Sequence, residues 1–202
     1  MTLALCTARL DLVLDTNTCQ RAGQRAGSDM NMKSPVPSHG FRTAAAIVAL
    51  WLVAGGVGAA AVGDAAPAFA LPTAPVGTIS LDQLRGQVVY VDFWASWCGP
   101  CRRSFPWMNE MQQRYGGRGV TIVAINVDAK RADAVRFLRQ YPATFAVVYD
   151  STGATPGAYA VKAMPSSYII DPQGRIAGVE QGFLEERRAA VEETIRSLIP
   201  AR

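Results

Sequence analysis

The sequence predicts an α/β fold, a central mixed β-sheet flanked by helices, on three observations. Half of the 202 residues are hydrophobic and 18% are charged, which excludes a disordered chain, a collagen and a coiled coil. Residues 87–127 follow the order strand, helix, strand, which predicts a βαβ unit with parallel pairing. Near the C-terminus, the turn sequence DPQG at 171–174 separates two short strand-like segments and predicts an antiparallel hairpin.

The first expected element is an extended lead-in rich in proline and alanine. Phe69 and Leu71 alternate along it, so we expect both side chains to pack against the domain. Ser80 is then expected to cap a single helical turn that Gly86 closes.

The βαβ unit follows from local composition and spacing. Residues 87–94, QVVYVDFW, are mostly β-branched or aromatic and have the length of a strand. Residues 98–115 have helical spacing and end at two glycines. Residues 121–127, TIVAINV, form a second apolar run, as expected for a strand covered on both faces.

The remaining elements are predicted in the same way. A helix is expected over 133–140, with Ala134, Val135 and Leu138 facing the core. The other expected elements are a strand at 145–149, a turn or small helix at 155–159, strands at 167–170 and 175–180, and a closing helix at 185–198.

The charge distribution argues against a nucleic-acid partner. The net charge is +4, but residues 1–61 contribute five basic and three acidic side chains to it. Residues 62–202 hold the other 15 basic and 13 acidic residues, with no Lys/Arg cluster beyond pairs such as Arg102-Arg103. The basic surface that a phosphate backbone requires is therefore not expected.

Residues 43–62 form an apolar segment of twenty residues without a charge. As a helix, at about 1.5 Å per residue, the segment could cross roughly 30 Å of hydrocarbon. Small residues ending at Ala61 also form an A-x-A site for a signal peptidase. We favour a cleaved signal peptide, with a retained membrane anchor as the alternative. Both place the following domain in the periplasm or outside the cell, because Lys33 and Arg42 precede the apolar segment.

Residues 1–29 do not resemble the start of a signal peptide, whereas translation from Met30 or Met32 would give a short basic leader. We interpret residues 1–29 as an over-extended start; a cytoplasmic tail is the alternative. The expected organisation is an extension and basic leader at 1–42, the apolar segment at 43–62 and a folded domain at 63–202. The one histidine, His39, lies outside that domain, which excludes histidine-dependent hydrolases.

A Cys-x-x-Cys motif, Trp97-Cys98-Gly99-Pro100-Cys101, lies where a strand is expected to end and a helix to begin. Two intervening residues place both sulfurs on one helical turn, close enough for an S–S bond of about 2.05 Å. Cys98 is expected at the positive end of the helix, which favours its thiolate, and Cys101 is expected to be more shielded. The motif therefore predicts that Cys98 attacks a disulfide of a partner protein and Cys101 resolves the mixed disulfide, with no metal and no bound cofactor.

The segment VDFWASWCGPCR at 91–102 resembles the active-site motif of the thioredoxin superfamily, and the resemblance implies a thioredoxin fold. It also implies that Asp92 is the buried acid that moves a proton to or from the second cysteine. Met164-Pro165 matches the cis-proline loop that faces the cysteines and pairs with the substrate backbone. The implied substrate-binding residues are Trp97, Gly99, Pro100, Met164 and Pro165.

Several features are similar to one extracytoplasmic branch of this superfamily, the TlpA/ResA/CcmG group of thiol-disulfide oxidoreductases. Asp128 and Pro165 are 37 residues apart, which leaves about twenty residues more than a single connecting helix requires. The PxFxL lead-in, LxxLRGQ and PSSYIIDPQGRI also match this group. Two positions depart from related proteins: Ala124 replaces the lysine of cytosolic thioredoxins, and Asp128-Ala129 replaces a glutamate found in some reductases of cytochrome maturation.

The resemblance implies an exported protein disulfide reductase, with roles in cytochrome c or copper-centre maturation. The implied partners are client proteins with disulfides, such as apocytochrome c or copper-centre proteins, and a membrane thiol reductant of the DsbD or CcdA type. Contact with the membrane is expected only through the N-terminal segment. Gly99-Pro100 resembles the dipeptide of reducing thioredoxins, which favours the reducing direction.

Two other functions remain open, a disulfide oxidase or isomerase and a Cu(I)-binding module without exchange activity, because two thiolates also suit Cu(I). A structural zinc site is disfavoured, since it needs four ligands and residues 63–202 offer two cysteines and no histidine.

Burial is expected for Trp94 and for Asp92, whose neighbours are apolar, while Trp97 is expected at the docking surface. The charged run at 185–188 is expected to be solvated.

Overall fold

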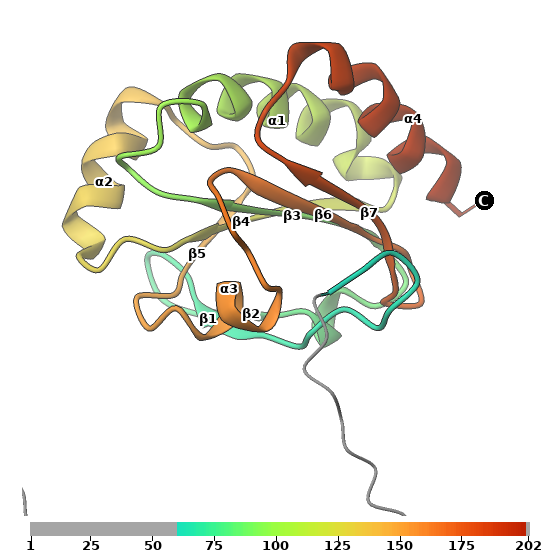
Figure 1. Ribbon diagram of the computed structural model, residues 1–202, viewed down its shortest axis with the longest axis horizontal. Helices are drawn as coiled ribbons and strands as arrows, with labels where there is room; N and C mark the ends of the chain where they lie inside the picture. Colours follow the sequence, from blue (N-terminus) through green and yellow to red (C-terminus); the bar gives the residue numbers. More distant parts are fainter. Residues whose placement is uncertain (1–59, 201–202) are drawn as a thin grey trace, which may run out of the picture. The chain divides into compact units, whose positions relative to one another are not determined.

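A five-stranded mixed sheet lies at the centre of the computed structural model, which describes residues 60–200 (Figure 1). The strand order is β5-β4-β3-β6-β7. Strands β3, β4 and β5 are parallel, whereas β6 runs antiparallel to β3, and β7 to β6. The strands are β3 (Val88–Trp94), β4 (Val120–Asn126), β5 (Ala146–Tyr149), β6 (Ser166–Ile170) and β7 (Ile176–Gln181). The predicted α/β fold with a mixed sheet is therefore confirmed.

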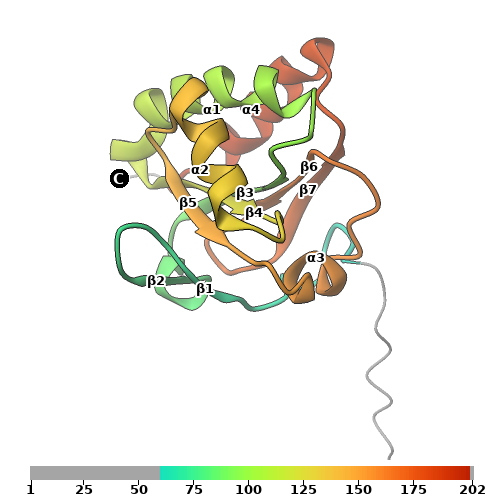
Figure 2. The same ribbon diagram turned by 90° about the vertical axis from the view of Figure 1, so that its left-hand side faces the viewer.

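Three helices cover one face of the sheet, and α3 and a small hairpin cover the other (Figures 1 and 2). The covering helices are α1 (Cys101–Tyr115), α2 (Arg131–Gln140) and α4 (Arg188–Leu198). The opposite face carries β1 (Ala70–Pro72), β2 (Thr78–Ser80) and α3 (Ala154–Ala158). Short 3-10 helices lie at Asp82–Leu84, Gly116–Arg118 and Glu185–Arg187.

Alternation along β3 divides the interior into two hydrophobic cores. Tyr90 and Trp94 belong to the core beneath α1, α2 and α4, whereas Val91 and Phe93 belong to the core on the α3 side. Every residue of β3 is buried, as expected for the middle strand of a sheet covered on both faces. Asp92 lies between Tyr90 and Trp94 in this alternation, so its side chain is directed to the face that α1 covers.

The predicted insertion before the cis-proline at Pro165 forms regular secondary structure. Between Asp128 and Pro165 the chain forms α2, then β5 at the edge of the sheet beside β4, then α3. Tyr159, directly after α3, is fully buried and donates a hydrogen bond to the Pro67 carbonyl at 2.8 Å. The additional residues thus widen the sheet and hold the lead-in against it.

Three local predictions were wrong. Ser80 ends β2 and does not cap the following turn, for which Leu81 occupies the N-cap position. The helix predicted from Cys98 begins at Cys101, because residues 95–100 form a loop. Val135 is 37% exposed, and Phe137 is buried instead, together with Ala134.

Other local predictions were confirmed. Trp94 is fully buried, and the DPQG turn joins β6 to β7, with Gly174 at φ +82°. The run at 185–188 forms surface ion pairs, among them Arg187 with Glu180 at 2.7 Å. The expected leader and residues 43–59 of the apolar segment lie outside the described residues. Within residues 60–200, no helix has the length and apolarity to cross a membrane.

Candidate active site

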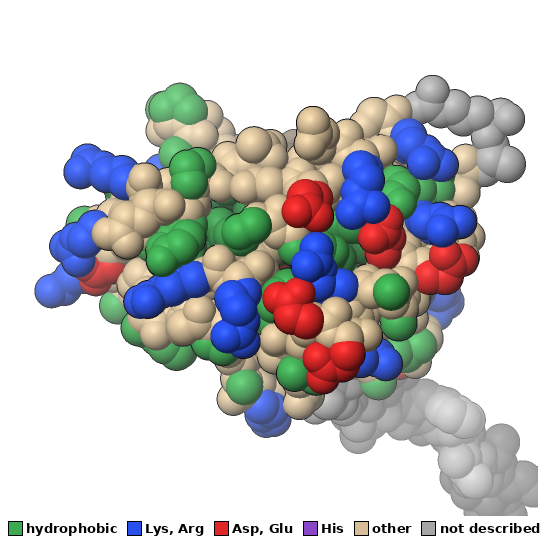
Figure 3. All heavy atoms as spheres, turned by 90° about the horizontal axis from the view of Figure 1, so that it is seen from above, with side chains coloured by type: hydrophobic (Ala, Val, Ile, Leu, Met, Phe, Trp, Pro, Cys, Tyr) green, Lys and Arg blue, Asp and Glu red, His purple; other side chains and the backbone are tan. Residues whose placement is uncertain are grey.

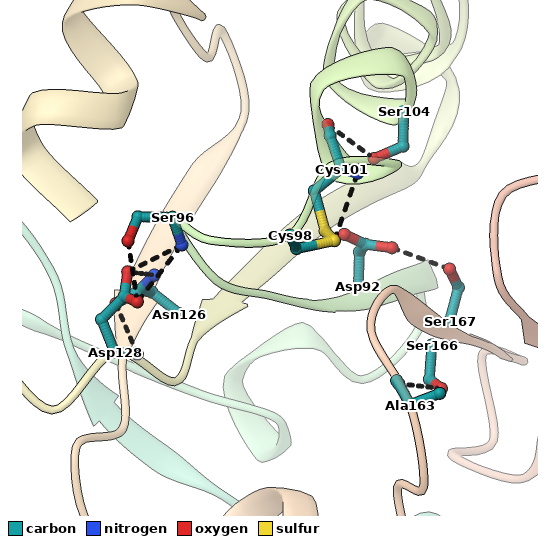
Figure 4. Close-up of a disulfide and its surroundings, with 10 residues drawn as sticks. All are labelled: Asp92, Ser96, Cys98, Cys101, Ser104, Asn126, Asp128, Ala163, Ser166 and Ser167. Atoms are coloured by element: carbon teal, nitrogen blue, oxygen red, sulfur yellow. Dashed lines mark hydrogen bonds between the residues drawn. A yellow bond between two sulfur atoms is a disulfide. The ribbon is translucent and has the colours of Figure 1, made fainter. Parts of the chain in front are cut away.

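Cys98 and Cys101 form a disulfide at the start of α1 (Figure 4). The S–S distance is 2.02 Å and the Cα atoms are 5.4 Å apart. The Cys101 backbone N–H donates to Cys98 Sγ at 3.2 Å, so Cys98 accepts one of the amide hydrogens that the helix start leaves free. Stabilisation of a Cys98 thiolate by the helix start stays a prediction, because Cys98 is bonded to Cys101 here and precedes the helix by three residues.

Burial separates the two cysteines only slightly. Cys101 is fully buried and Cys98 is 3% exposed. The prediction that Cys101 is the more shielded of the two is therefore confirmed, by a narrow margin. Trp97, in contrast, is 68% exposed directly beside Cys98, and Gly99 is also exposed. Trp97 thus presents a large exposed aromatic surface next to the cysteine pair.

Asp92 is a fully buried carboxyl group near the middle of the sheet. Desolvation raises the pKa of Asp92 from its usual value to about 7, and a hydrogen bond from Ser167 opposes this rise. Ser167 Oγ donates to Asp92 Oδ1 at 2.8 Å, while Oδ2 has no hydrogen-bond partner among residues 60–200. Figure 4 shows the carboxyl group on the side of β3 that carries the disulfide. The group can therefore exchange a proton near neutral pH.

The peptide bond between Met164 and Pro165 is cis, as the resemblance implied. Pro165 is buried at the start of β6, and its carbonyl accepts a hydrogen bond from the Gly182 N–H at 2.8 Å. Ser166 Oγ donates to the Ala163 carbonyl at 2.8 Å, which closes the turn around the proline. Because β6 lies beside β3 in the sheet, this loop lies at the same end of the sheet as the cysteines.

A carboxylate network that sequence reasoning missed holds the loop before the cysteines. Asp128, after β4, accepts hydrogen bonds from the Ser96 N–H and the Ser96 hydroxyl, each at 3.0 Å. Asn126 Nδ2 donates to the same carboxylate at 2.8 Å, and both Asn126 and Asp128 are buried. The network ties the β3–α1 loop to the neighbouring strand and so fixes the backbone that leads into Trp97 and Cys98. The sequence singled out Asp128 only as a departure from a family pattern.

Residues 60–200 contain no group of three or more His, Cys, Asp or Glu side chains able to hold a metal ion. The chemistry available at the site is that of the cysteine pair, with a buried carboxyl group as a proton donor or acceptor.

Residues 62–179 match the AhpC/TSA family. Thiol-disulfide oxidoreductase ResA of Oceanobacillus iheyensis is 37% identical over 127 residues, which cover 61% of this chain and 66% of that protein. ResA of Bacillus subtilis is 34% identical over 124 residues, which cover 61% of this chain and 69% of that protein. The chain thus spans about two thirds of the length of these curated relatives.

A solved structure, described as a thiol:disulfide interchange protein DsbE from Chlorobium tepidum, has a similar fold with a TM-score of 0.67. The two sequences are 48% identical, and the alignment covers 69% of this chain and 99% of that one. These relatives and the cysteine pair support thiol-disulfide redox chemistry at the site. The chain therefore belongs to the AhpC/TSA family, within the thioredoxin superfamily.

Proposed function

We propose that the protein is an extracytoplasmic protein disulfide reductase that works through Cys98 and Cys101. The observation that carries the proposal is the disulfide at the start of α1, in which Cys98 Sγ accepts the Cys101 N–H. The relatives named thiol-disulfide oxidoreductase support the same chemistry. The proposed location rests on the apolar segment 43–62 that precedes the domain.

The proposed reaction starts from the reduced protein and conserves atoms and electrons. The Cys98 thiolate attacks a client disulfide, forming a mixed disulfide and releasing one client thiolate. Cys101 then loses its proton and attacks Cys98 Sγ, which forms the Cys98–Cys101 bond and releases the second client thiolate. Two electrons pass to the client. Asp92, with its pKa raised to about 7, is the proposed acceptor of the Cys101 proton.

The oxidised protein must be reduced again before the next cycle. We propose that a membrane dithiol donor of the DsbD or CcdA type supplies the two electrons, because an oxidising compartment would not supply them. Apocytochrome c or copper-centre proteins are the proposed clients, on the basis of the resemblance to the TlpA/ResA/CcmG group. Trp97, Gly99, Pro100, Met164 and Pro165 are the proposed client-binding surface.

Trapping of the intermediate tests the roles of the two cysteines. Cys101→Ser should accumulate mixed disulfides between Cys98 and client proteins, seen as species that disappear on reduction in non-reducing gels. Cys98→Ser is the matched control and should trap nothing, because the attacking sulfur is absent. Trapping by Cys98→Ser alone would reverse the assigned roles.

The direction of electron flow is tested by the reduction potential, measured by Trp fluorescence across a series of thiol-disulfide buffers. A value of about −270 mV or lower supports a reductase, whereas a value of about −120 mV would make the protein an oxidant. Stoichiometric Cu(I) binding without any turnover in an insulin reduction assay would instead favour the copper module.

A further inference from the structure

A cleft of about 150 Å³ lies beside the redox motif, between the loop before Cys98 and helix α2. Ser96 and Arg102, on either side of the cysteines in the sequence, form one wall. Helix α2 and the residue after it provide Arg136, Gln140 and Tyr141. We call this hollow the arginine cleft.

The arginine cleft has an excess of positive charge. The Arg102 guanidinium is exposed and has no ion pair or hydrogen bond with any side chain among residues 60–200. Arg136 pairs with Asp133, which also lines the cleft, at 3.3 Å, but the two side chains are 71% and 39% exposed. An exposed pair one helical turn apart is weak, so Arg136 can exchange Asp133 for another carboxylate. Asp128 precedes α2 in the sequence, but its carboxylate oxygens already accept hydrogen bonds from Ser96 and Asn126.

The surface around the arginine cleft is also positively charged. Segments 97–104 and 129–140 together carry six basic residues and one acidic residue, whereas segment 180–198 carries three basic and five acidic residues. Figure 3 shows Lys and Arg side chains predominating at the end of the molecule where α2 lies, and mixed charges at the other end. The six basic residues are Arg102, Arg103, Lys130, Arg131, Arg136 and Arg139.

The cleft and the cis-proline loop lie on opposite sides of the disulfide. Strand β3, which leads to the cysteines, lies between β4 and β6 in the sheet. Ser96 is hydrogen-bonded to Asp128, which follows β4, whereas Pro165 precedes β6. Figure 4 shows Ser96 on one side of the cysteines and Ala163, Ser166 and Ser167 on the other. An extended polypeptide that contacted the cis-proline loop and crossed the cystine would reach the arginine cleft next.

We propose that the arginine cleft binds acidic side chains that flank the exchanging cysteine of a polypeptide client. Guanidinium groups present parallel N–H donors that match a carboxylate, and Arg102 has these donors free. The basic surround would also attract an acidic segment before contact and so raise the association rate. The inference rests on the proposed function, because it assigns the substrate preference of that same site.

The test compares disulfide peptides of equal length in which the cysteine is flanked by Glu, Gln or Lys. Stopped-flow Trp fluorescence gives the rate constant for oxidation of the reduced protein by each peptide. We expect the Glu peptide to react about fivefold faster than the Gln peptide at low salt, a difference that shrinks at high salt. The Lys peptide should be slower than the Gln peptide.

Substitution locates the preference in the cleft. Arg102→Gln combined with Arg136→Gln should bring the Glu-to-Gln rate ratio close to one, whereas Arg196→Gln on α4 should leave the ratio unchanged. The ratio cancels any general effect of Arg102 on the reactivity of Cys98. Equal rates for the Glu and Gln peptides in the unmodified protein, or an unchanged ratio in the double variant, would overturn the proposal. Failure of the reductase function itself is distinct, because then no peptide would react.

Discussion

The hydroxyl of Ser167 supplies the one hydrogen bond that the Asp92 carboxyl group has within residues 60–200. A hydrogen bond donated to a carboxylate favours the charged form, so this bond lowers the Asp92 pKa against the effect of desolvation. Ser167→Ala should therefore raise the pKa of Asp92 above about 7. An NMR titration of the Asp92 carboxyl carbon measures the change.

Ser166→Ala is the matched control for this prediction. Ser166 is the next residue of β6, but its hydroxyl donates to the Ala163 carbonyl and not to Asp92. The Asp92 pKa should therefore stay unchanged in that variant. If Ser167→Ala lowers the pKa of Asp92 or leaves it unaltered, the hydrogen bond does not have the assigned effect.

For single residues, local sequence signals predicted the cysteine pair and the buried carboxyl group, but not the side chains that form hydrogen bonds around them. Cys98, Cys101 and the burial of Asp92 were predicted because the residue types and their immediate neighbours carry the signal. The contacts of Ser167 with Asp92 and of Ser96 with Asp128 join residues 75 and 32 positions apart. Nothing local marks such pairs, because the strand register and the loop path that bring them together are properties of the folded sheet.

Phe137 is the aromatic side chain through which helix α2 packs in the core, beside the buried Ala134. Phe137 packs against Trp94 of β3 and Phe105 of α1, with ring centroids 4.8 and 5.0 Å apart. Phe137→Ala should lower the free energy of unfolding by about 3 kcal/mol, through lost burial and the cavity left behind. Chemical denaturation measures the loss.

The neighbouring Val135 provides the control on the same helix. Its side chain is exposed, so Val135→Ala should change the unfolding free energy by less than about 0.5 kcal/mol. A larger effect of Val135→Ala than of Phe137→Ala would restore the packing face that the sequence predicted and contradict the observed one.

The elements that the sequence predicted well are those with a strong period or turn signal. The βαβ unit around Cys98 and the hairpin at 171–174 belong to this group. The β1–β2 hairpin was not predicted, because the alternation of Phe69 and Leu71 indicates an extended segment but strands of three residues are too short to reveal their pairing. Ser80 was assigned to a cap for the same reason: its pairing with Ala70 depends on a contact that the local sequence does not encode.

For the whole molecule, net charge gave an incomplete description of the surface. Residues 62–202 have a net charge of +2 and no long run of Lys or Arg, so a basic surface was not expected. The fold nevertheless brings the start of α1 close to α2, and both are basic. A patch built from two segments cannot be recognised from linear runs alone. The exclusion of nucleic acid as a partner stays a prediction.

The pH dependence of stability is a whole-molecule quantity that Asp92 should dominate in the oxidised protein. Its pKa is raised from 3.8 to about 7 in the folded state, so between these values the folded protein holds a proton that the unfolded chain has lost. The contribution of Asp92 to stability is therefore greatest below the unfolded pKa and is lost as the pH rises to about 7. The loss should total about 4 kcal/mol, since each pKa unit corresponds to about 1.4 kcal/mol.

Asp92→Asn isolates this contribution, because asparagine is close in shape to the protonated aspartate and cannot ionise. At about pH 3 the variant should unfold at a denaturant concentration similar to that of the parent protein, and at about pH 8 it should be more stable than the parent. Asp82→Asn removes a charge from an exposed side chain and serves as the control. Parallel stability curves for the parent and Asp92→Asn across this range would show that Asp92 is ionised equally in both states. The same result would remove Asp92 as the proton acceptor of Cys101, because a carboxyl group that stays charged at neutral pH has little affinity for that proton.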